Sequence, residues 1–195
     1  MNNSIEQTMD DSRIGPGRHD TVAEVSDIDD TLVLTDPALK AATKAEFGTE
    51  MSRAEVRKLP KEVKRRFLAT AYSQFAGLLV PNEHWITEFN IRQAYPDHTG
   101  VVLSARTEAT RAPTEALLRR VGASFEYLIL SPPVITHDEE FKAGALLDLA
   151  SLFDEVRYYE DKLENLDFIL KHYPEVCAKK LRLFLVDSLT VREIR

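Results

Sequence analysis

The sequence predicts an α/β fold in which helices cover both faces of a mostly parallel sheet. Apolar runs of strand length recur from Thr21 onward, and each of them ends at a polar residue. Segments with helical spacing separate the later runs, and alternation of strands and helices is typical of parallel sheets. With 195 residues, 44% of them apolar, the chain is long enough for one well-buried domain. The strand-like runs are residues 21–28, 99–105, 125–131, 155–160 and 181–188, and the helical segments are residues 108–122, 139–153 and 164–174.

Composition excludes several classes of protein. No run approaches the roughly 18–20 apolar residues of a membrane helix, and residues 1–20 lack the apolar core of a secretory signal. This polar stretch contains the breaker GPG, so we expect a flexible N-terminal tail. Cys177 is the only cysteine, which excludes an internal disulfide and a thiolate zinc site. The net charge of −7 disfavours a broadly basic nucleic-acid binder. We therefore expect a cytoplasmic protein in which oxygen or histidine would hold any metal.

Residues 36–97 interrupt the alternation of strands and helices. The segment is too long for one crossover connection, and its prolines and Gly48 divide it into several helices. Between Lys40 and Arg66 it carries nine basic and four acidic residues, a local charge of +5 in an acidic protein. Either this is an ordinary solvated helix surface, or the segment is a cap that attracts an anionic substrate. We predict a helical cap at 36–97, inserted into a core made of residues 21–35 and 98–195.

Polar side chains follow the predicted strands at the points where the strands end. In an open parallel sheet, ligands bind at the carboxyl ends of the strands. The first strand leads to Asp27 and Asp29, the second to Ser104 and Arg106, and the fourth to Glu160 and Asp161, while Lys142 lies in the helix before the fourth strand. Carboxylates, a hydroxyl and two cationic groups at one edge suit a phosphoryl group and a hard divalent cation such as Mg²⁺.

The order of these motifs resembles that of the haloacid dehalogenase-like (HAD) phosphatase superfamily. The chain has DIDDT at 27–31, LSAR at 103–106, the isolated Lys142 and the ED pair at 160–161. Each motif alone is common, as an acidic turn, a helix cap or a surface lysine, but the four in order are harder to explain structurally. The resemblance covers residues 21 to about 188. It implies a Rossmann-like three-layer fold with strand order 5-4-1-2-3 and a small helical cap after the first strand.

The resemblance also implies a role for each motif residue. Asp27 would be the nucleophile that forms a phosphoaspartate, and Asp29 would be the general acid and base. Lys142 would screen the charge that otherwise repels a carboxylate from a phosphate dianion. We expect burial and neighbouring carboxylates to raise the pKa of Asp29, because a general acid must hold its proton near neutral pH.

Further residues would bind the phosphate and the metal. Ser104 would hold a phosphate oxygen, Thr31 would brace the phosphate-binding loop, and Arg106 would bind phosphate through two hydrogen bonds. A salt bridge from Arg106 to Asp161 or Glu108 is the alternative. The resemblance assigns Mg²⁺ to four residues, Asp27, Asp29 through its carbonyl, Asp161 and Glu160. Asp30 stands where many relatives have glycine, and we assign it no chemistry.

Within the superfamily, LSAR and YYEDKLEN look most like the polynucleotide 3′-phosphatases and the Swiss Army Knife RNA-repair phosphatases. Arg106 agrees with that subgroup, whereas Lys162 replaces its arginine after the acidic pair. SDIDDT is equally similar to a phosphatidate phosphatase family, whose later motifs fit less well. The 77 residues between Asp27 and Ser104 have room for a modest cap, which would admit larger substrates.

The sequence therefore predicts a Mg²⁺-dependent phosphomonoester hydrolase. The expected substrate is a nucleic-acid 3′-phosphate or a nucleotide. A phosphatase of sugars or other small metabolites is the alternative. A non-catalytic binding protein with the same fold is less expected, because Asp27, Asp29 and Lys142 are all present.

Overall fold

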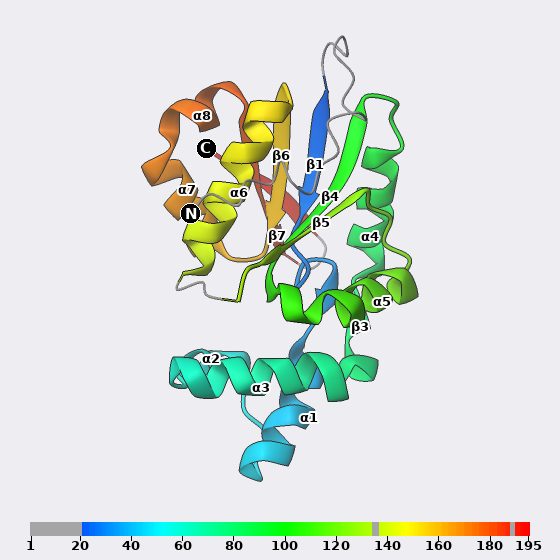
Figure 1. The fold of residues 1–195 in the computed structure, drawn as a ribbon, viewed down its shortest axis with the longest axis vertical. Helices are drawn as coiled ribbons and strands as arrows, with labels where there is room; N and C mark the ends of the chain where they lie inside the picture. The colour runs from blue at the N-terminus through cyan, green and yellow to red at the C-terminus, as the bar shows by residue number, and fades with distance from the viewer. Residues whose placement is uncertain (1–20, 134–136, 188–189) are drawn as a thin grey trace.

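The computed structural model describes residues 21–133, 137–187 and 190–195, and a six-stranded sheet lies at their centre (Figure 1). Its order is β5-β4-β1-β6-β7-β8. Neighbouring strands are parallel, except that β8 is antiparallel to β7. The five parallel strands have the predicted order 5-4-1-2-3, which confirms the fold class. The predicted tail at 1–20 lies outside the described residues. The strands are β1 (Val22–Ser26), β4 (His98–Thr107), β5 (Tyr127–Ser131), β6 (Glu155–Glu160), β7 (Leu181–Asp187) and β8 (Thr190–Ile194).

The edge strand β8 is the detail in which the sheet differs from the prediction. Its sequence, TVREI, is half-buried at best, because it pairs with β7 on one side only. Such a strand lacks the apolar run by which a central strand of a parallel sheet is recognised.

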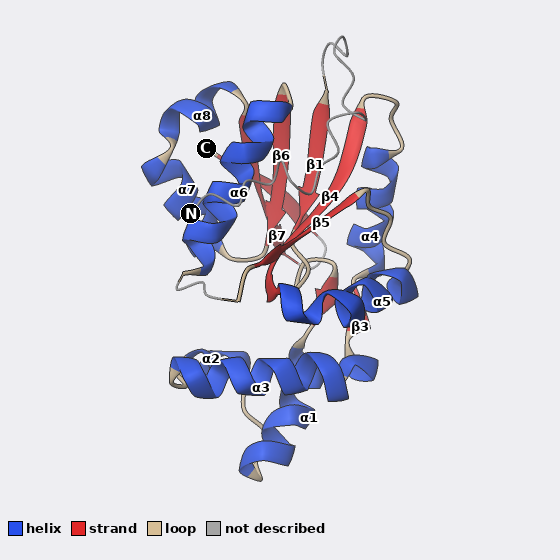
Figure 2. Cartoon of the chain, in the orientation of Figure 1, coloured by secondary structure: helices blue, strands red, loops and turns tan. Residues whose placement is uncertain are grey.

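Helices cover both faces of the sheet (Figure 2). Residues of α6 and α7 pack with one face in a core that includes Val25, Val101 and Tyr158. Residues of α4 and α5 pack against the other face with Val102 and Tyr159. Across the described residues, every helix is too short or too polar to cross a lipid bilayer. The helices are α4 (Glu83–Gln93), α5 (Arg111–Val121), preceded by the 3₁₀ turn η3 (Glu108–Thr110), α6 (Asp138–Leu152), α7 (Leu163–His172) and α8 (Pro174–Lys179).

The alternation of side chains along β1 decides which face each residue meets. Val25 belongs to the core beneath α6, whereas the hydroxyl of Ser26 accepts a hydrogen bond of 3.0 Å from the indole of Trp85 on α4. Successive residues of a strand point to opposite faces, so Asp27 continues the series that includes Val25. The strand thus directs Asp27 toward α6, which carries Lys142.

Between β1 and β4, three helices lie apart from the sheet, at the end where β1 leads into the insert (Figure 1). They have a small core of their own, which includes Leu39, Val56 and Phe67. The insert leaves and returns through a short antiparallel ribbon in which Val33 pairs with Pro81. Helix α4 packs against β1 and β4 instead. The division into cap and core remains a proposal. The elements are β2 (Val33–Leu34), α1 (Asp36–Phe47), α2 (Arg53–Arg57), α3 (Lys61–Gln74), η2 (Ala76–Leu78) and β3 (Val80–Pro81).

Candidate active site

A buried lysine joins two of the predicted carboxylates. Lys142 Nζ lies 2.8 Å from Asp27 Oδ1 and 2.7 Å from Glu160 Oε2, and all three side chains are at least 97% buried. Asp27 follows β1, Glu160 ends β6 and Lys142 lies in the second turn of α6. The parallel pairing of β1 with β6 brings the two carboxylates to the same edge of the sheet. The carboxylates in turn hold Lys142 protonated, because their charges raise its pKa further than burial lowers it.

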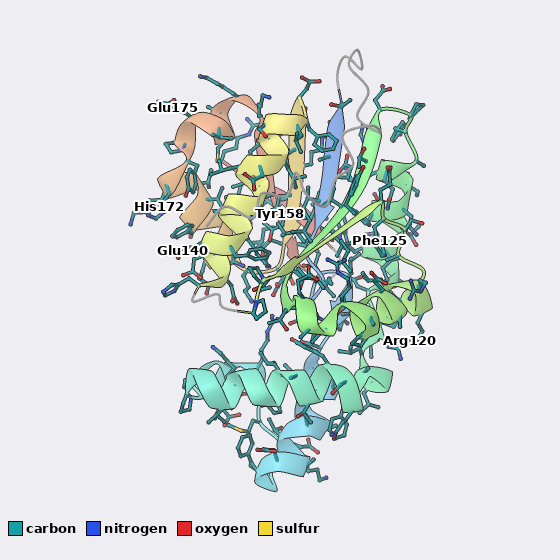
Figure 3. The ribbon with its side chains drawn as sticks, in the orientation of Figure 1. Arg120, Phe125, Glu140, Tyr158, His172 and Glu175 are labelled. Carbon is teal, nitrogen blue, oxygen red and sulfur yellow. The ribbon has the colours of Figure 1, made fainter. Side chains whose placement is uncertain are left out.

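Glu160 is saturated by hydrogen bonds. Its Oε2 accepts from Tyr158 OH at 2.5 Å and from Asn165 Nδ2 at 2.8 Å, in addition to Lys142, and its Oε1 accepts from the Lys162 amide at 3.2 Å. Figure 3 shows Tyr158 at the centre of the sheet. Burial raises the pKa of Glu160, but Lys142 and Lys162 outweigh burial and lower it. Glu160 is therefore a fixed anion that orients Lys142.

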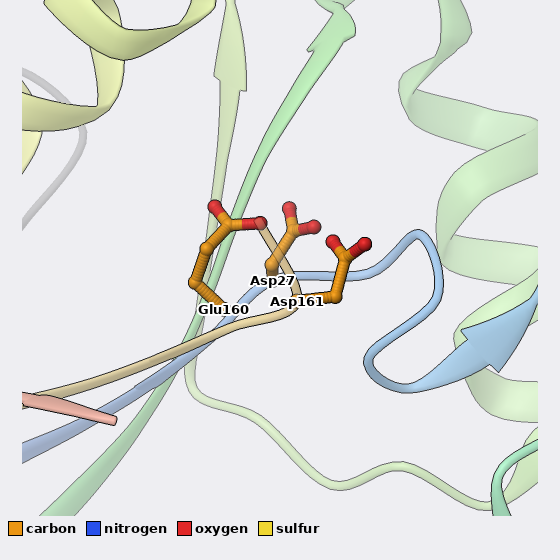
Figure 4. Close-up of side chains that lie close together, drawn as sticks. All are labelled: Asp27, Glu160 and Asp161. Carbon is orange, nitrogen blue, oxygen red and sulfur yellow. The ribbon is translucent and has the colours of Figure 1, made fainter. Parts of the chain in front are cut away.

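Asp161 completes an acidic cluster with Asp27 and Glu160. One oxygen from each of the three carboxylates lies within 4.8 Å of the others (Figure 4). Asp161 Oδ1 is buried and has no hydrogen-bond partner in the described part of the chain. Burial raises the pKa of Asp27 and of Asp161, and the neighbouring carboxylates add to that shift. Crowded carboxylates with an unpaired oxygen are the donor set that a hard divalent cation prefers.

A second group of residues is centred on Arg106, which donates two hydrogen bonds to the Asp29 carboxylate. Arg106 Nη2 lies 2.6 Å from Asp29 Oδ1, and Arg106 Nε lies 3.1 Å from Asp29 Oδ2. The pairing of β4 with β5 shifts register between Ser104 and Thr107, and the Arg106 amide donates to Ser104 Oγ at 3.3 Å within that irregularity. Irregularities of this kind re-aim side chains near ligand sites. The partner of Arg106 is thus Asp29, not Asp161 or Glu108.

The raised pKa expected for Asp29 is wrong in this arrangement. Burial raises the pKa of Asp29, but the charge and hydrogen bonds of Arg106 outweigh burial and lower it. Strand β1 ends at Ser26, and Asp29 lies within the turns that follow it. Asp29 therefore meets a different set of partners from Asp27. Without a ligand to take Arg106, Asp29 is an ionised carboxylate.

The loop after Asp27 is shaped by Asp30. Its φ of 64° lies in the left-handed region, where glycine is preferred and aspartate is among the better-tolerated alternatives. Its carboxylate accepts hydrogen bonds from the Thr35 amide at 2.8 Å and the Thr35 hydroxyl at 2.9 Å. The Thr31 carbonyl accepts a hydrogen bond from Asn82, while its buried hydroxyl has no partner among the described residues. Asp30 therefore adopts a left-handed backbone conformation that glycine adopts most readily, and its carboxylate stabilises the turn through Thr35.

Two residues of the insert, Tyr72 and Arg53, reach the site although neither was among the predicted site residues. The ring of Tyr72 on α3 lies 4.0 Å from the guanidinium carbon of Arg106. Arg53 at the start of α2 forms ion pairs with Asp30 and, at 3.1 Å, with Asp161. A capping box between Ser52 and Glu55 fixes that helix start. The basic charge of the insert could have indicated that Arg53 lies near an anionic site. No local sequence pattern indicates a position for Tyr72.

The predicted residues thus gather at one edge of the sheet. Lys142 contacts Asp27 and Glu160, and Asp161 lies close to these two carboxylates. A second group joins Asp29, Arg106 and Ser104. The Thr31 hydroxyl forms no hydrogen bond with either group among the described residues. Arrangement alone does not test the roles assigned to these residues, which remain proposals.

Comparison with known proteins identifies the fold. No model of a known protein family matches the chain, and no curated protein matches it. A HAD-superfamily hydrolase of subfamily IA from Geobacter sulfurreducens has a TM-score of 0.56 and 12% identity over 84% of this chain and 85% of that one. Protein Tyrosine Kinase A of Mycobacterium tuberculosis has a TM-score of 0.60 and 14% identity over 86% of this chain and 84% of that one.

A chain from a Pnkp1/Rnl/Hen1 complex is also similar, with a TM-score of 0.57 and 16% identity. The match covers 87% of this chain but 47% of that one, so this chain spans about half the length of that relative. Names as different as hydrolase and tyrosine kinase among these structures show that the shared feature is the fold, which does not fix the activity. The protein has the fold of the haloacid dehalogenase-like hydrolases, as its motifs predict.

Proposed function

We propose that the protein is a Mg²⁺-dependent phosphomonoester hydrolase that works through a phosphoaspartate at Asp27. The observation that carries this proposal is the buried contact of Lys142 with both Asp27 and Glu160, next to the unpaired oxygen of Asp161. A carboxylate attacks a phosphate dianion only when nearby positive charge screens their repulsion. Lys142 supplies that charge from a fixed position, because Glu160 holds it.

The donor set fits a divalent cation. Asp161 offers an oxygen without a partner, and one oxygen of Asp27 lies within 4.8 Å of one of Asp161. The oxygens of Glu160, in contrast, already accept hydrogen bonds from four donors. We therefore assign direct metal contact to Asp27 and Asp161, with the Asp29 carbonyl that the family resemblance implies, and assign Glu160 to positioning. When bound, Mg²⁺ would supply charge neutralisation to the substrate phosphate.

The reaction would proceed in two steps. Asp27 attacks phosphorus while the bond from phosphorus to the leaving oxygen breaks, and Asp29 protonates that oxygen. Water then attacks the phosphoaspartate and gives its proton to Asp29, the bond from phosphorus to Asp27 breaks, and inorganic phosphate leaves. The phosphomonoester and one water thus become an alcohol and phosphate. Asp27 ends ionised and Asp29 ends protonated, as each was in the substrate complex when the first step began.

The contact of Arg106 with Asp29 suggests how substrate prepares the acid. The two N–H groups of Arg106 that bind the Asp29 carboxylate could equally donate hydrogen bonds to two oxygens of a phosphate. A phosphate that binds these N–H groups releases Asp29 from the group that lowers its pKa. Substrate binding would then favour the protonated Asp29 that the first step requires.

Tyr72 should hold Arg106 in place for this exchange. We expect Tyr72→Leu to raise KM for an aryl phosphate roughly tenfold, since a buried stacked cation is stabilised by about 1–2 kcal/mol. The effect on kcat should be smaller. Tyr72→Phe keeps the ring and should behave like the wild type, while Tyr95→Leu, at an exposed tyrosine, is the matched control. Steady-state kinetics measure both constants, and equal KM values for the Leu and Phe variants would contradict this role.

The proposed substrate is a nucleic-acid 3′-phosphate or a nucleotide. The motifs resemble the polynucleotide 3′-phosphatase subgroup, and the similarity to a chain of the Pnkp1/Rnl/Hen1 complex is suggestive in the same direction. Arg53 supports a cap that meets an anionic substrate, whereas Lys40 pairs with Asp36 at 2.6 Å on the surface of α1, like an ordinary solvated face. A phosphatase of small metabolites is the alternative. A cytoplasmic location remains a prediction from the sequence.

The first test is hydrolysis of p-nitrophenyl phosphate. We expect activity with Mg²⁺, loss of activity in EDTA and recovery when Mg²⁺ is added in excess, because the acidic cluster repels the phosphate until its charge is neutralised. Release of nitrophenol is followed by absorbance. Full activity in EDTA after exhaustive dialysis would reject the metal dependence, and no hydrolysis of any phosphomonoester in a broad panel would reject the function.

A further inference from the structure

A hollow of about 450 Å³ opens beside the acidic cluster, between the carboxyl ends of β6 and β7 and the start of α2. Asp161 belongs to both the cluster and the hollow. Its side chain is nine-tenths buried, and its Oδ1 has no partner among the described residues. A group that occupies this hollow would therefore adjoin a phosphate held at Asp27. Its volume lies in the range of small-ligand pockets.

The polar part of the lining carries negative charge. Asp30, Asp161 and Asp187 contribute three carboxylates, and Arg53 contributes one guanidinium. That guanidinium is already paired with Asp30 and Asp161. Asp187 forms no ion pair among the described residues, so its carboxylate would repel a further phosphate on the leaving group.

The remaining lining is aliphatic. Leu34 and Leu185 lie on it, and Leu163, at the first position of α7, is 41% exposed. An exposed leucine at the mouth of a hollow gives a ring system an apolar surface to cover. The carboxylate oxygens across the hollow can accept hydrogen bonds from hydroxyl groups.

We propose that this hollow is the leaving-group subsite and that it takes an uncharged, hydroxyl-bearing ring system such as a nucleoside. The inference rests on the proposed function and narrows it. The substrate is a nucleoside monophosphate, and a leaving group with additional phosphates, including a longer nucleic-acid strand, is disfavoured. Asp187 is the residue that sets this preference, because it lies on the lining at the end of β7 and away from the acidic cluster.

The catalytic test compares adenosine 3′-phosphate with adenosine 3′,5′-bisphosphate, which differ by one phosphate on the leaving group. We expect the wild type to prefer the monophosphate at least tenfold in kcat/KM. Asp187→Lys should reduce that ratio about tenfold, because it replaces a repulsive charge by an attractive one. Asp167→Lys, on the exposed surface of α7, is the matched control and should keep the wild-type ratio. A wild type that hydrolyses both compounds equally, or a ratio that Asp187→Lys leaves unchanged, overturns the proposal.

A binding test needs no turnover and separates this proposal from the proposed function. Adenosine, which has no phosphate to lose, is titrated into the wild type and followed by NMR. Leu163→Asp should weaken adenosine binding at least tenfold, whereas Leu78→Asp, at a leucine that is 46% exposed on η2, should not change it. Adenosine binding that is absent, or insensitive to Leu163→Asp, overturns the subsite even if aryl phosphate is hydrolysed. Binding as expected in a protein without hydrolytic activity would reject the function and keep the subsite.

Discussion

Replacing Asp27 with asparagine is expected to lower kcat for p-nitrophenyl phosphate by a factor on the order of 10⁴ or more, as loss of a nucleophile does in other covalent mechanisms. The amide has nearly the shape of the carboxylate but cannot form the phosphoaspartate. Lys142 remains paired with Glu160 at 2.7 Å, so the variant should fold normally. The measurement is steady-state hydrolysis, with circular dichroism to confirm the fold.

Trapping the intermediate makes this test specific. Acid-quenched wild type should carry one phosphoryl group on the peptide that contains Asp27, detected by mass spectrometry, and Asp27→Asn should carry none. Asp167→Asn, on the exposed surface of α7, controls for loss of a carboxylate elsewhere. If Asp27→Asn hydrolyses the substrate at the wild-type rate, attack by Asp27 is excluded and a directly activated water must replace it.

The part of the fold that the sequence predicted depends on regular patterns. Apolar runs that alternate with helical spacing are enough to define the parallel strands, and parallel strands bring their carboxyl ends to one edge. For this reason Asp27, Glu160 and Asp161 meet although 133 residues separate the first two along the chain. The position of Lys142 follows from the same topology, because α6 packs across β4 and β6.

The contacts that the sequence did not predict join elements whose relative placement has no periodic signal. Tyr72 and Arg53 reach the site because the insert folds on a core of its own and returns through the ribbon of β2 and β3. The pairing of Arg106 with Asp29 depends on the irregularity in β4 and on the turn after Asp27. The motifs show that Arg106 and Asp29 are present. Which groups they contact in the absence of a ligand depends on the conformation of the loops that carry them.

The pKa of Asp29 shows the consequence for chemistry. Burial is readable from the sequence, and burial does act to raise the pKa of Asp29. The opposing interaction is the charge and the two hydrogen bonds of Arg106, which lies 77 positions from Asp29 in the sequence. It lowers the pKa of Asp29 more than burial raises it. Asp29 can therefore act as a general acid only after Arg106 has left its carboxylate. The sequence alone does not suggest this step.

Replacing Lys142 with methionine should destabilise the fold as well as abolish activity. The ammonium is 1% exposed and lies within 2.8 Å of Asp27 and of Glu160, so its removal leaves two buried carboxylates without their shared cation. Removing one partner of a buried ion pair typically costs about 3–5 kcal/mol, because the remaining charge stays desolvated. Urea unfolding measures the change in the free energy of unfolding. Lys171→Met, at an exposed lysine near the end of α7, should change it by less than about 0.5 kcal/mol.

A second substitution separates stability from catalysis. Glu160→Gln removes the charge that Lys142 balances while keeping an acceptor for Tyr158 and Asn165, so Lys142→Met/Glu160→Gln should recover much of the lost stability. Activity should not return, because Asp27 would still meet the phosphate dianion without an ammonium beside it. A double variant that regains both would show that Lys142 serves the fold alone. A single variant as stable as the wild type would instead contradict the buried charge network, since two unscreened carboxylates cannot remain ionised there without a measurable cost.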